Sequence, residues 1–96
     1  MTKSDLISRL RILEANLVKI DRINPLYFDF LIDDCIRLLG ELRDHTRNFM
    51  IIDHTIALLK NESIVDDTLE NHKAQCKRLD AIIGGTVTMA EHIARF

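Results

Sequence analysis

Apolar residues recur every three or four positions through most of the chain, and this spacing constrains the fold more than any other feature of the sequence. In an α-helix such positions fall on one side and form a stripe that must be covered by other apolar surface. A half-buried β-strand would instead alternate apolar and polar residues, and no stretch alternates for long enough to predict one. The spacing therefore predicts an all-α protein.

The first predicted helix begins near Ser4 and ends near Arg22. Asn24 and Pro25 mark its end, because proline disfavours helical geometry in the residue before it and suits the first turn of a new helix. The stripe that this helix is expected to bury consists of Leu6, Leu10, Leu13, Leu17 and Ile20. A second helix is expected to begin at Pro25.

This second helix is predicted to run without interruption from residue 25 to about residue 60. Its apolar positions follow the alternating spacing of a coiled-coil seam. The seam consists of Phe28, Leu31, Cys35, Leu38, Leu42, His45, Phe49, Ile52, Ile56 and Leu59. His45 is its polar member and is expected to be a buried residue that sets register. Gly40 is not expected to interrupt the helix, because glycine costs only about 1 kcal/mol relative to alanine.

A third helix is predicted over residues 64–83, antiparallel to the second. The residues before it indicate a tight reversal, with Ser63 as the N-cap of the new helix. Gly84 and Gly85 predict a break or kink, after which a last segment, residues 86–95, resumes the helical spacing.

The expected architecture is a coiled-coil-like helical bundle in a single domain, residues 1–96. Residues 25–60 and 64–83 form a long antiparallel hairpin, and the N-terminal helix packs on its first half. In the second half, two helices cannot shield their apolar seam by themselves. The simplest cover is a second copy of the chain, which predicts a homodimeric four-helix arrangement. Its predicted interface consists of Phe49, Ile52, Ile56, Leu59, Val65 and Leu69. The same surface would otherwise serve another protein, which would make the chain an adaptor or inhibitor.

Composition and charge argue against several classes of protein. Of the 96 residues, 47% are apolar and 29% are charged, which is typical of a folded domain and not of a disordered one. The net charge of −2 gives no strong attraction to nucleic acid or to an anionic membrane. Because no apolar stretch is long enough for a membrane span or a signal sequence, a cytoplasmic location is expected. Cys35 and Cys76 form no metal or redox motif and are expected to be reduced thiols.

His72 and Cys76 are the pair most suggestive of metal chemistry, because residues four apart on a helix share a face and both types bind zinc. A zinc site needs further ligands, and the predicted hairpin places none opposite them. The pair is therefore expected to lie in the core, while a metal site completed across the dimer stays open. The sequence shows no glycine-rich phosphate loop, nucleophile elbow or paired catalytic carboxylates. We expect no catalytic residue, cofactor or metal, and no enzyme activity.

Asp29, Asp33 and Asp34 form an acidic cluster among aromatic residues, of which Phe30 is one. Such a cluster is typical of a surface that binds a basic partner or imitates a phosphate backbone. More often such a cluster is a solvated helix face near a helix N-terminus, where the helix dipole stabilises negative charge.

The sequence as a whole predicts a non-enzymatic protein–protein interaction module: a small regulatory, adaptor or inhibitor protein that acts as a helical homodimer on an unidentified protein partner. The alternative is a helical dimer that binds or imitates nucleic acid through one charged helix face. The basic residues available for that role are Arg9, Arg11, Lys19, Arg22, Lys73, Lys77 and Arg78. They are diluted by acidic residues and lack interleaved aromatic residues, which makes nucleic acid the less favoured partner.

Overall fold

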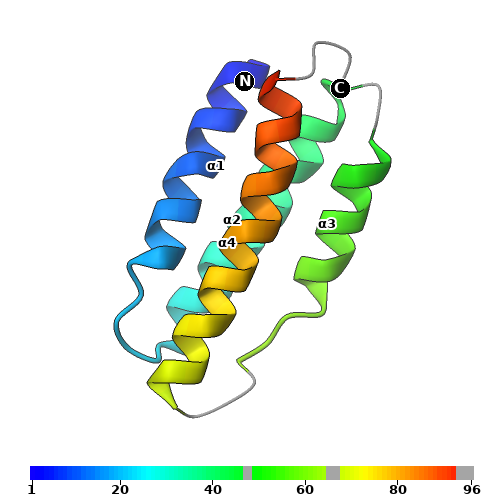
Figure 1. Ribbon diagram of the computed structural model, residues 1–96. Coiled ribbons are helices and arrows are strands. Elements are labelled where there is room, and N and C mark those ends of the chain that lie inside the picture. The colour runs from blue at the N-terminus through cyan, green and yellow to red at the C-terminus, as the bar shows by residue number, and fades with distance from the viewer. Residues whose placement is uncertain (47–48, 65–67, 93–96) are drawn as a thin grey trace.

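A computed structural model of the chain describes residues 1–46, 49–64 and 68–92. These residues form four α-helices and no strand. The helices are α1 (Lys3–Val18), α2 (Pro25–Arg43), α3 (Met50–Lys60) and α4 (Leu69–His92). Successive helices run in opposite directions, and α4 returns to lie beside α1 (Figure 1). The predicted all-α class is confirmed.

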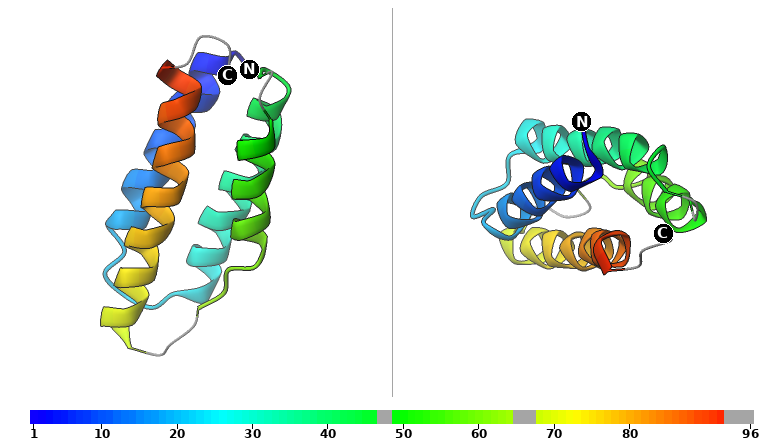
Figure 2. Two further views of the ribbon diagram at one scale, coloured as in Figure 1. Left: turned by 45° about the vertical axis from the view of Figure 1, so that its right-hand side comes forward. Right: turned by 90° about the horizontal axis from the view of Figure 1, so that it is seen from above.

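The four helices form a ring of neighbours around one core. α1 packs against α2 and most extensively against α4, and α3 packs against α2. The packing of α3 on α4 is the least close of the neighbouring pairs. α1 and α3 lie on one diagonal of the bundle, and α2 and α4 lie on the other (Figure 2). The molecule measures 41 × 21 × 19 Å along its principal axes.

Side-chain caps fix the starts of the first two helices. The Thr2 hydroxyl accepts a hydrogen bond from the Asp5 backbone N–H at 3.1 Å, and the Asp5 carboxylate accepts one from the Thr2 N–H at 3.3 Å. This reciprocal arrangement is a capping box, which satisfies two backbone donors that the helix leaves without partners. Asn24 accepts from the Tyr27 N–H at 3.2 Å, and Pro25 is the first residue of α2. The predicted start of the second helix is therefore confirmed.

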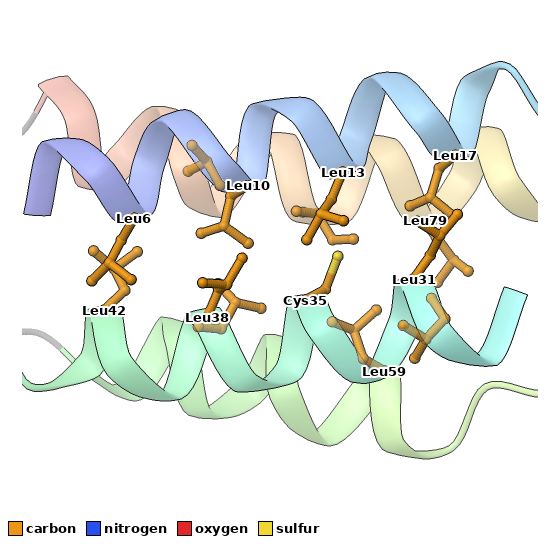
Figure 3. Packing of buried hydrophobic residues seen from close by; sticks show 14 of the residues in the cluster. Leu6, Leu10, Leu13, Leu17, Leu31, Cys35, Leu38, Leu42, Leu59 and Leu79 are labelled. Carbon is orange, nitrogen blue, oxygen red and sulfur yellow. The ribbon is translucent and has the colours of Figure 1, made fainter. Parts of the chain in front are cut away.

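The core is built from layers of facing side chains on α1 and α2 (Figure 3). In successive layers Leu6 lies opposite Leu42, Leu10 opposite Leu38, Leu13 opposite Cys35, and Leu17 opposite Leu31. All these residues are buried, as is Ile20. The residues predicted for the first stripe are thus buried as expected, but the helix ends at Val18 and not near Arg22, so Ile20 lies in the segment after α1.

Thr55 and Thr86 make a buried polar contact between α3 and α4. Their hydroxyl oxygens are 2.6 Å apart. The Thr55 hydroxyl is also 2.9 Å from the Ile51 carbonyl oxygen, and the Thr86 hydroxyl is 3.2 Å from that of Ile82. Each hydroxyl has one proton, so the two threonines can donate only two of these three hydrogen bonds at a time. One threonine therefore donates to the other hydroxyl, and the second threonine donates to the carbonyl oxygen of its own helix.

The prediction of one helix from residue 25 to residue 60 is wrong. α2 ends at Arg43, and the chain folds back so that α3, starting at Met50, packs against α2. Across this reversal, Arg43 Nε donates to Asp53 Oδ1 at 2.7 Å, and the Arg43 guanidinium lies 4.3 Å from the centre of the Phe49 ring. His45, predicted to be a buried member of the seam, is exposed in the turn after α2.

The seam pattern continues across this reversal because α2 and α3 each bury an apolar stripe with the same spacing. Residues 43–48 are all polar, and this run was the sequence signal of the interruption. Gly40 lies inside α2 and interrupts nothing. The polar run, which includes the seam position His45, marks the turn here, and the glycine does not.

The predicted helix over 64–83 and the break at Gly84 and Gly85 also need correction. α4 begins at Leu69 and continues through both glycines to His92. Gly84 has a packing role instead, since a Cβ there would lie 2.5 Å from Oε1 of Glu14, a buried residue of α1. A Cβ on Gly85 would meet nothing within 4 Å.

Half of the interface predicted for a homodimer, three of its six residues, is buried or partly buried within one chain. Ile52 and Leu59 are fully buried, and Ile56 is partly buried against the same core. Phe49 and Leu69 are 43% and 37% exposed, but they flank helix starts at opposite ends of the bundle (Figure 1). Val65 lies outside the described residues. The uncovered seam from which the dimer was argued is therefore absent from the described part of the chain, and the dimer itself stays a prediction.

Candidate protein-interaction surface

The first two turns of α2 present large apolar side chains to solvent. Leu26 is 83% exposed and Phe30 is 60% exposed. They stand four residues apart, which places them on one side of the helix, while Phe28 points into the core and is fully buried. Together with Asp29 and Asp33, both exposed, they form a surface that we call the outer α2 face.

The two acidic residues of the outer α2 face have no cationic partner among the residues that the structure describes. Neither Asp29 nor Asp33 forms an ion pair with any residue that the structure describes. They stand four apart on one helix, a spacing at which like charges destabilise a helix by about 0.2–0.5 kcal/mol. The arrangement therefore costs the fold a little free energy.

The helix dipole does not account for these two charges. The first turn of α2 contains no acidic residue, and the effect of the dipole is largely confined to the terminal turn. At this end the Asn24 side chain accepts from the Tyr27 N–H, and the Asn24 carbonyl oxygen accepts from the Phe28 N–H. The solvated-helix interpretation of the acidic cluster thus lacks the stabilisation on which it was based.

Asp34, the third member of the predicted cluster, belongs elsewhere. It is half-buried and accepts hydrogen bonds from Arg37 Nη2 at 2.7 Å and Arg37 Nε at 3.2 Å. Arg37 also lies 3.6 Å from a carboxylate oxygen of Glu41. Of the three predicted acidic residues, the third is therefore neutralised by Arg37, while the other two lack an ion-pair partner in the described ranges.

Leu26 is the functional candidate that the sequence interpretation missed. It belongs neither to the predicted seam that begins with Phe28 nor to the predicted stripe of the first helix. An apolar residue that fits no buried stripe is the signal that would have identified it, since a helix presents such a residue to solvent.

Several of the basic residues proposed for nucleic acid are already engaged. Arg11 donates to Glu14, Thr88 and Glu91, at 3.3, 3.1 and 3.1 Å. Arg78 donates to Glu62 at 3.1 Å. The basic residues brought together are Lys19 of the segment after α1 and Lys73 and Lys77 of α4, which line one hollow that Asp21 also lines.

His72 and Cys76 lie in the core, as predicted. His72 Nδ1 is 3.3 Å from Gln75 Oε1, its ring packs edge-on against Phe28, and Cys76 Sγ is 4.0 Å from His72 Nε2. Gln75 is held in turn by Glu62 and by the Ser63 carbonyl oxygen, at 3.0 and 2.6 Å. Within the described residues, no group of three histidine, cysteine or acidic side chains is arranged to hold a metal ion.

Both cysteines are free and buried. Burial raises the pKa of the Cys35 thiol to about 12, and the nearby charges of Asp34 and Glu14 act in the same direction. Burial also raises the pKa of Cys76. Because the thiolate is the reactive form of cysteine, both side chains are poor nucleophiles at neutral pH.

None of the four described helices combines the length and apolar character needed to cross a bilayer. No model of a known protein family matches the chain, and comparisons with curated proteins and solved structures find no significant match.

Proposed function

We propose that the protein is a non-enzymatic interaction module, a small regulatory, adaptor or inhibitor protein, and that the outer α2 face is its working surface. The observation that carries this proposal is the juxtaposition of Leu26 and Phe30, both largely exposed, with the charges of Asp29 and Asp33, which form no ion pair within the described part of the chain. An apolar side chain left in water contributes nothing to the core, while its burial against a partner stabilises a complex by about 25 cal/mol per Å².

The experiment compares what the wild-type chain and a Leu26→Ser/Phe30→Ser variant capture from extract of the source cells. The double variant should fold normally, because exposed positions usually change the free energy of unfolding by less than about 0.5 kcal/mol. It should lose a protein that the wild type retains.

Ile12→Ser is the matched control, since Ile12 is 60% exposed like Phe30 but lies on α1. This control should retain the captured protein. The proposal fails if the double variant and the wild type capture the same proteins in the same amounts.

The homodimer belongs to the same proposal and is tested separately, by light scattering behind a sizing column. A mass of about twice 11.1 kDa supports it. In that case, Phe49→Ser and Leu69→Ser variants ask whether the exposed remnants of the predicted interface hold the two copies together. A mass of one chain at all concentrations rejects the dimer.

The alternative function, nucleic-acid binding, rests on the lysine-lined hollow between the end of α1 and α4. Lys73→Gln/Lys77→Gln should abolish binding to a labelled oligonucleotide, whereas Lys3→Gln/Lys60→Gln should not. Binding through these lysines would weaken steeply with salt, because it releases counterions from the phosphates.

A further inference from the structure

We propose that the partner of the outer α2 face is a basic amphipathic helix of another protein. This inference rests on the proposed function and names the chemistry of the partner. The partner helix lies along α2, covers Leu26 and Phe30 with apolar side chains, and places lysine or arginine side chains beside Asp29 and Asp33.

The spacing of exposed side chains favours a helix as the occupant. Leu26, Phe30, Asp33 and Arg37 follow one another at intervals of four, three and four along the outside of α2. This is the spacing of a coiled-coil seam, into which side chains of a second helix fit. Amphipathic helices recognise such rows through anchors with the same periodicity.

The charges on this seam favour a basic occupant. Arg37 is neutralised by Asp34 and Glu41 on its own helix, whereas Asp29 and Asp33 carry two negative charges with no ion pair to a described residue. A cation beside them relieves their mutual repulsion and meets the electrostatic complementarity of specific interfaces. An acidic or neutral helix would bury these carboxylates without a partner, which is costly.

A second copy of the chain is a less suitable occupant. Its α4 offers the right chemistry in Leu69, Lys73 and Lys77, which are exposed at intervals of four. However, α2 and α4 lie on a diagonal of the bundle, so their outer faces point in opposite directions (Figure 2). Pairing one copy's α2 with another's α4 would be head-to-tail and would not close into a twofold dimer.

The test is a selection that does not presuppose the answer. A displayed library of helical peptides of about four turns, with outward positions randomised, is selected on the full-length chain and counter-selected on Leu26→Ser/Phe30→Ser. Surviving peptides should carry apolar residues at intervals of three or four, together with an excess of lysine and arginine. A synthetic survivor should gain helical circular dichroism on binding.

The affinity of that peptide then tests the charges. Asp29→Asn/Asp33→Asn should weaken binding by about tenfold, and raising the salt from low to high concentration should weaken wild-type binding by a similar factor. Asp44→Asn/Glu70→Asn is the matched control, because both residues are exposed and lie away from the outer α2 face. This control should bind like wild type.

The possible failures are distinguishable. Survivors that depend on Leu26 and Phe30 but are neutral, acidic or non-helical would overturn the inference and leave the proposed function standing. Wild-type chains that self-associate through Leu26 and Phe30 would show that the occupant is a second copy, which also overturns it. If no peptide survives counter-selection the inference fails, and the capture experiment decides the proposed function by itself.

Discussion

Gly84 and Gly85 are neighbours in sequence with opposite surroundings, and each can be tested by a single methyl group. Gly85→Ala should raise the free energy of unfolding by about 0.5–1 kcal/mol, because alanine is the better helix former and the new Cβ meets nothing within 4 Å. Gly84→Ala should raise the free energy of unfolding by less than Gly85→Ala, or lower it, because the new Cβ would lie 2.5 Å from Glu14 Oε1. Urea unfolding measures both changes.

A Glu14→Ala background provides the control for this pair. In the Glu14→Ala background, Gly84→Ala should raise the free energy of unfolding by as much as Gly85→Ala does. The coupling energy between positions 14 and 84 should be at least about 0.5 kcal/mol. Equal gains at both glycines in both backgrounds would mean that Glu14 does not occupy the space above Gly84.

Glu14 also makes a prediction about pH. Burial raises its pKa, and the charge of Asp80 raises it further, although Arg11 acts in the opposite direction. At a pH between the unfolded and the folded value, Glu14 of the folded chain is therefore protonated more often than Glu14 of the unfolded chain. This contribution to stability is complete below the unfolded pKa and disappears as the pH rises through the folded value.

Glu14→Gln cannot ionise, so its stability should not show the loss that deprotonation of Glu14 causes in the wild type as the pH rises. Its free energy of unfolding, relative to wild type, should increase as the pH rises from about 4 and then level off. Glu91→Gln, which also removes a partner of Arg11 but at an exposed site, should show no such trend. A constant difference between Glu14→Gln and wild type at every pH would contradict the raised pKa.

At the scale of helices, the contact between Thr55 and Thr86 tests how α3 is attached to α4. Thr55→Val should lower the free energy of unfolding by about 1 kcal/mol, because it removes a buried hydrogen bond between the helices. Thr55→Val/Thr86→Val should cost less than the sum of the two single changes, because replacing both partners leaves neither hydroxyl without the other. Strictly additive costs, measured by urea unfolding, would argue against the contact.

Helix type and the first two helix starts could be predicted because they depend on local chemistry: the spacing of apolar residues, the cap at Asn24 and the restriction before Pro25. The reversal after Arg43 could not be predicted from spacing alone. Both α2 and α3 bury apolar stripes, and the two stripes happen to keep the same phase through His45 and Phe49. Whether a seam continues or folds back depends on tertiary packing, which a periodic pattern does not encode.

The candidate surface was predictable in part for the same reason. Asp29 and Asp33 stood out as charges that no buried stripe requires. The neutralisation of Asp34 depended on the side-chain geometry of Arg37, and the burial of Ile52 and Leu59 depended on the reversal. These facts concern the placement of side chains in space, which follows only once neighbouring helices are positioned.

At the scale of the whole molecule, the residues that α3 buries, Ile52, Thr55 and Leu59, are covered by helices of the same chain. Ile52→Asp should therefore destabilise the fold by several kcal/mol, because it buries an unpaired charge. The loss should be independent of protein concentration when urea unfolding is measured over a hundredfold range of dilution. In a thermal scan, each kcal/mol lost should lower the melting temperature by about 4 °C to 8 °C. A loss that grows with dilution would show that Ile52 also stabilises an association between chains.

The closed ring of helices has a consequence for the order in which they are joined. The start of α1 and the end of α4 lie together at one end of the bundle, where Lys3 and Glu91 line the same hollow (Figure 1). A short linker between them, with the chain reopened between α3 and α4 where packing is least close, would give a circular permutant with the order α4, α1, α2, α3. Every helix would keep its neighbours. We therefore expect the permutant to fold into the same bundle, because the packing between helices is unchanged by the order in which they are joined.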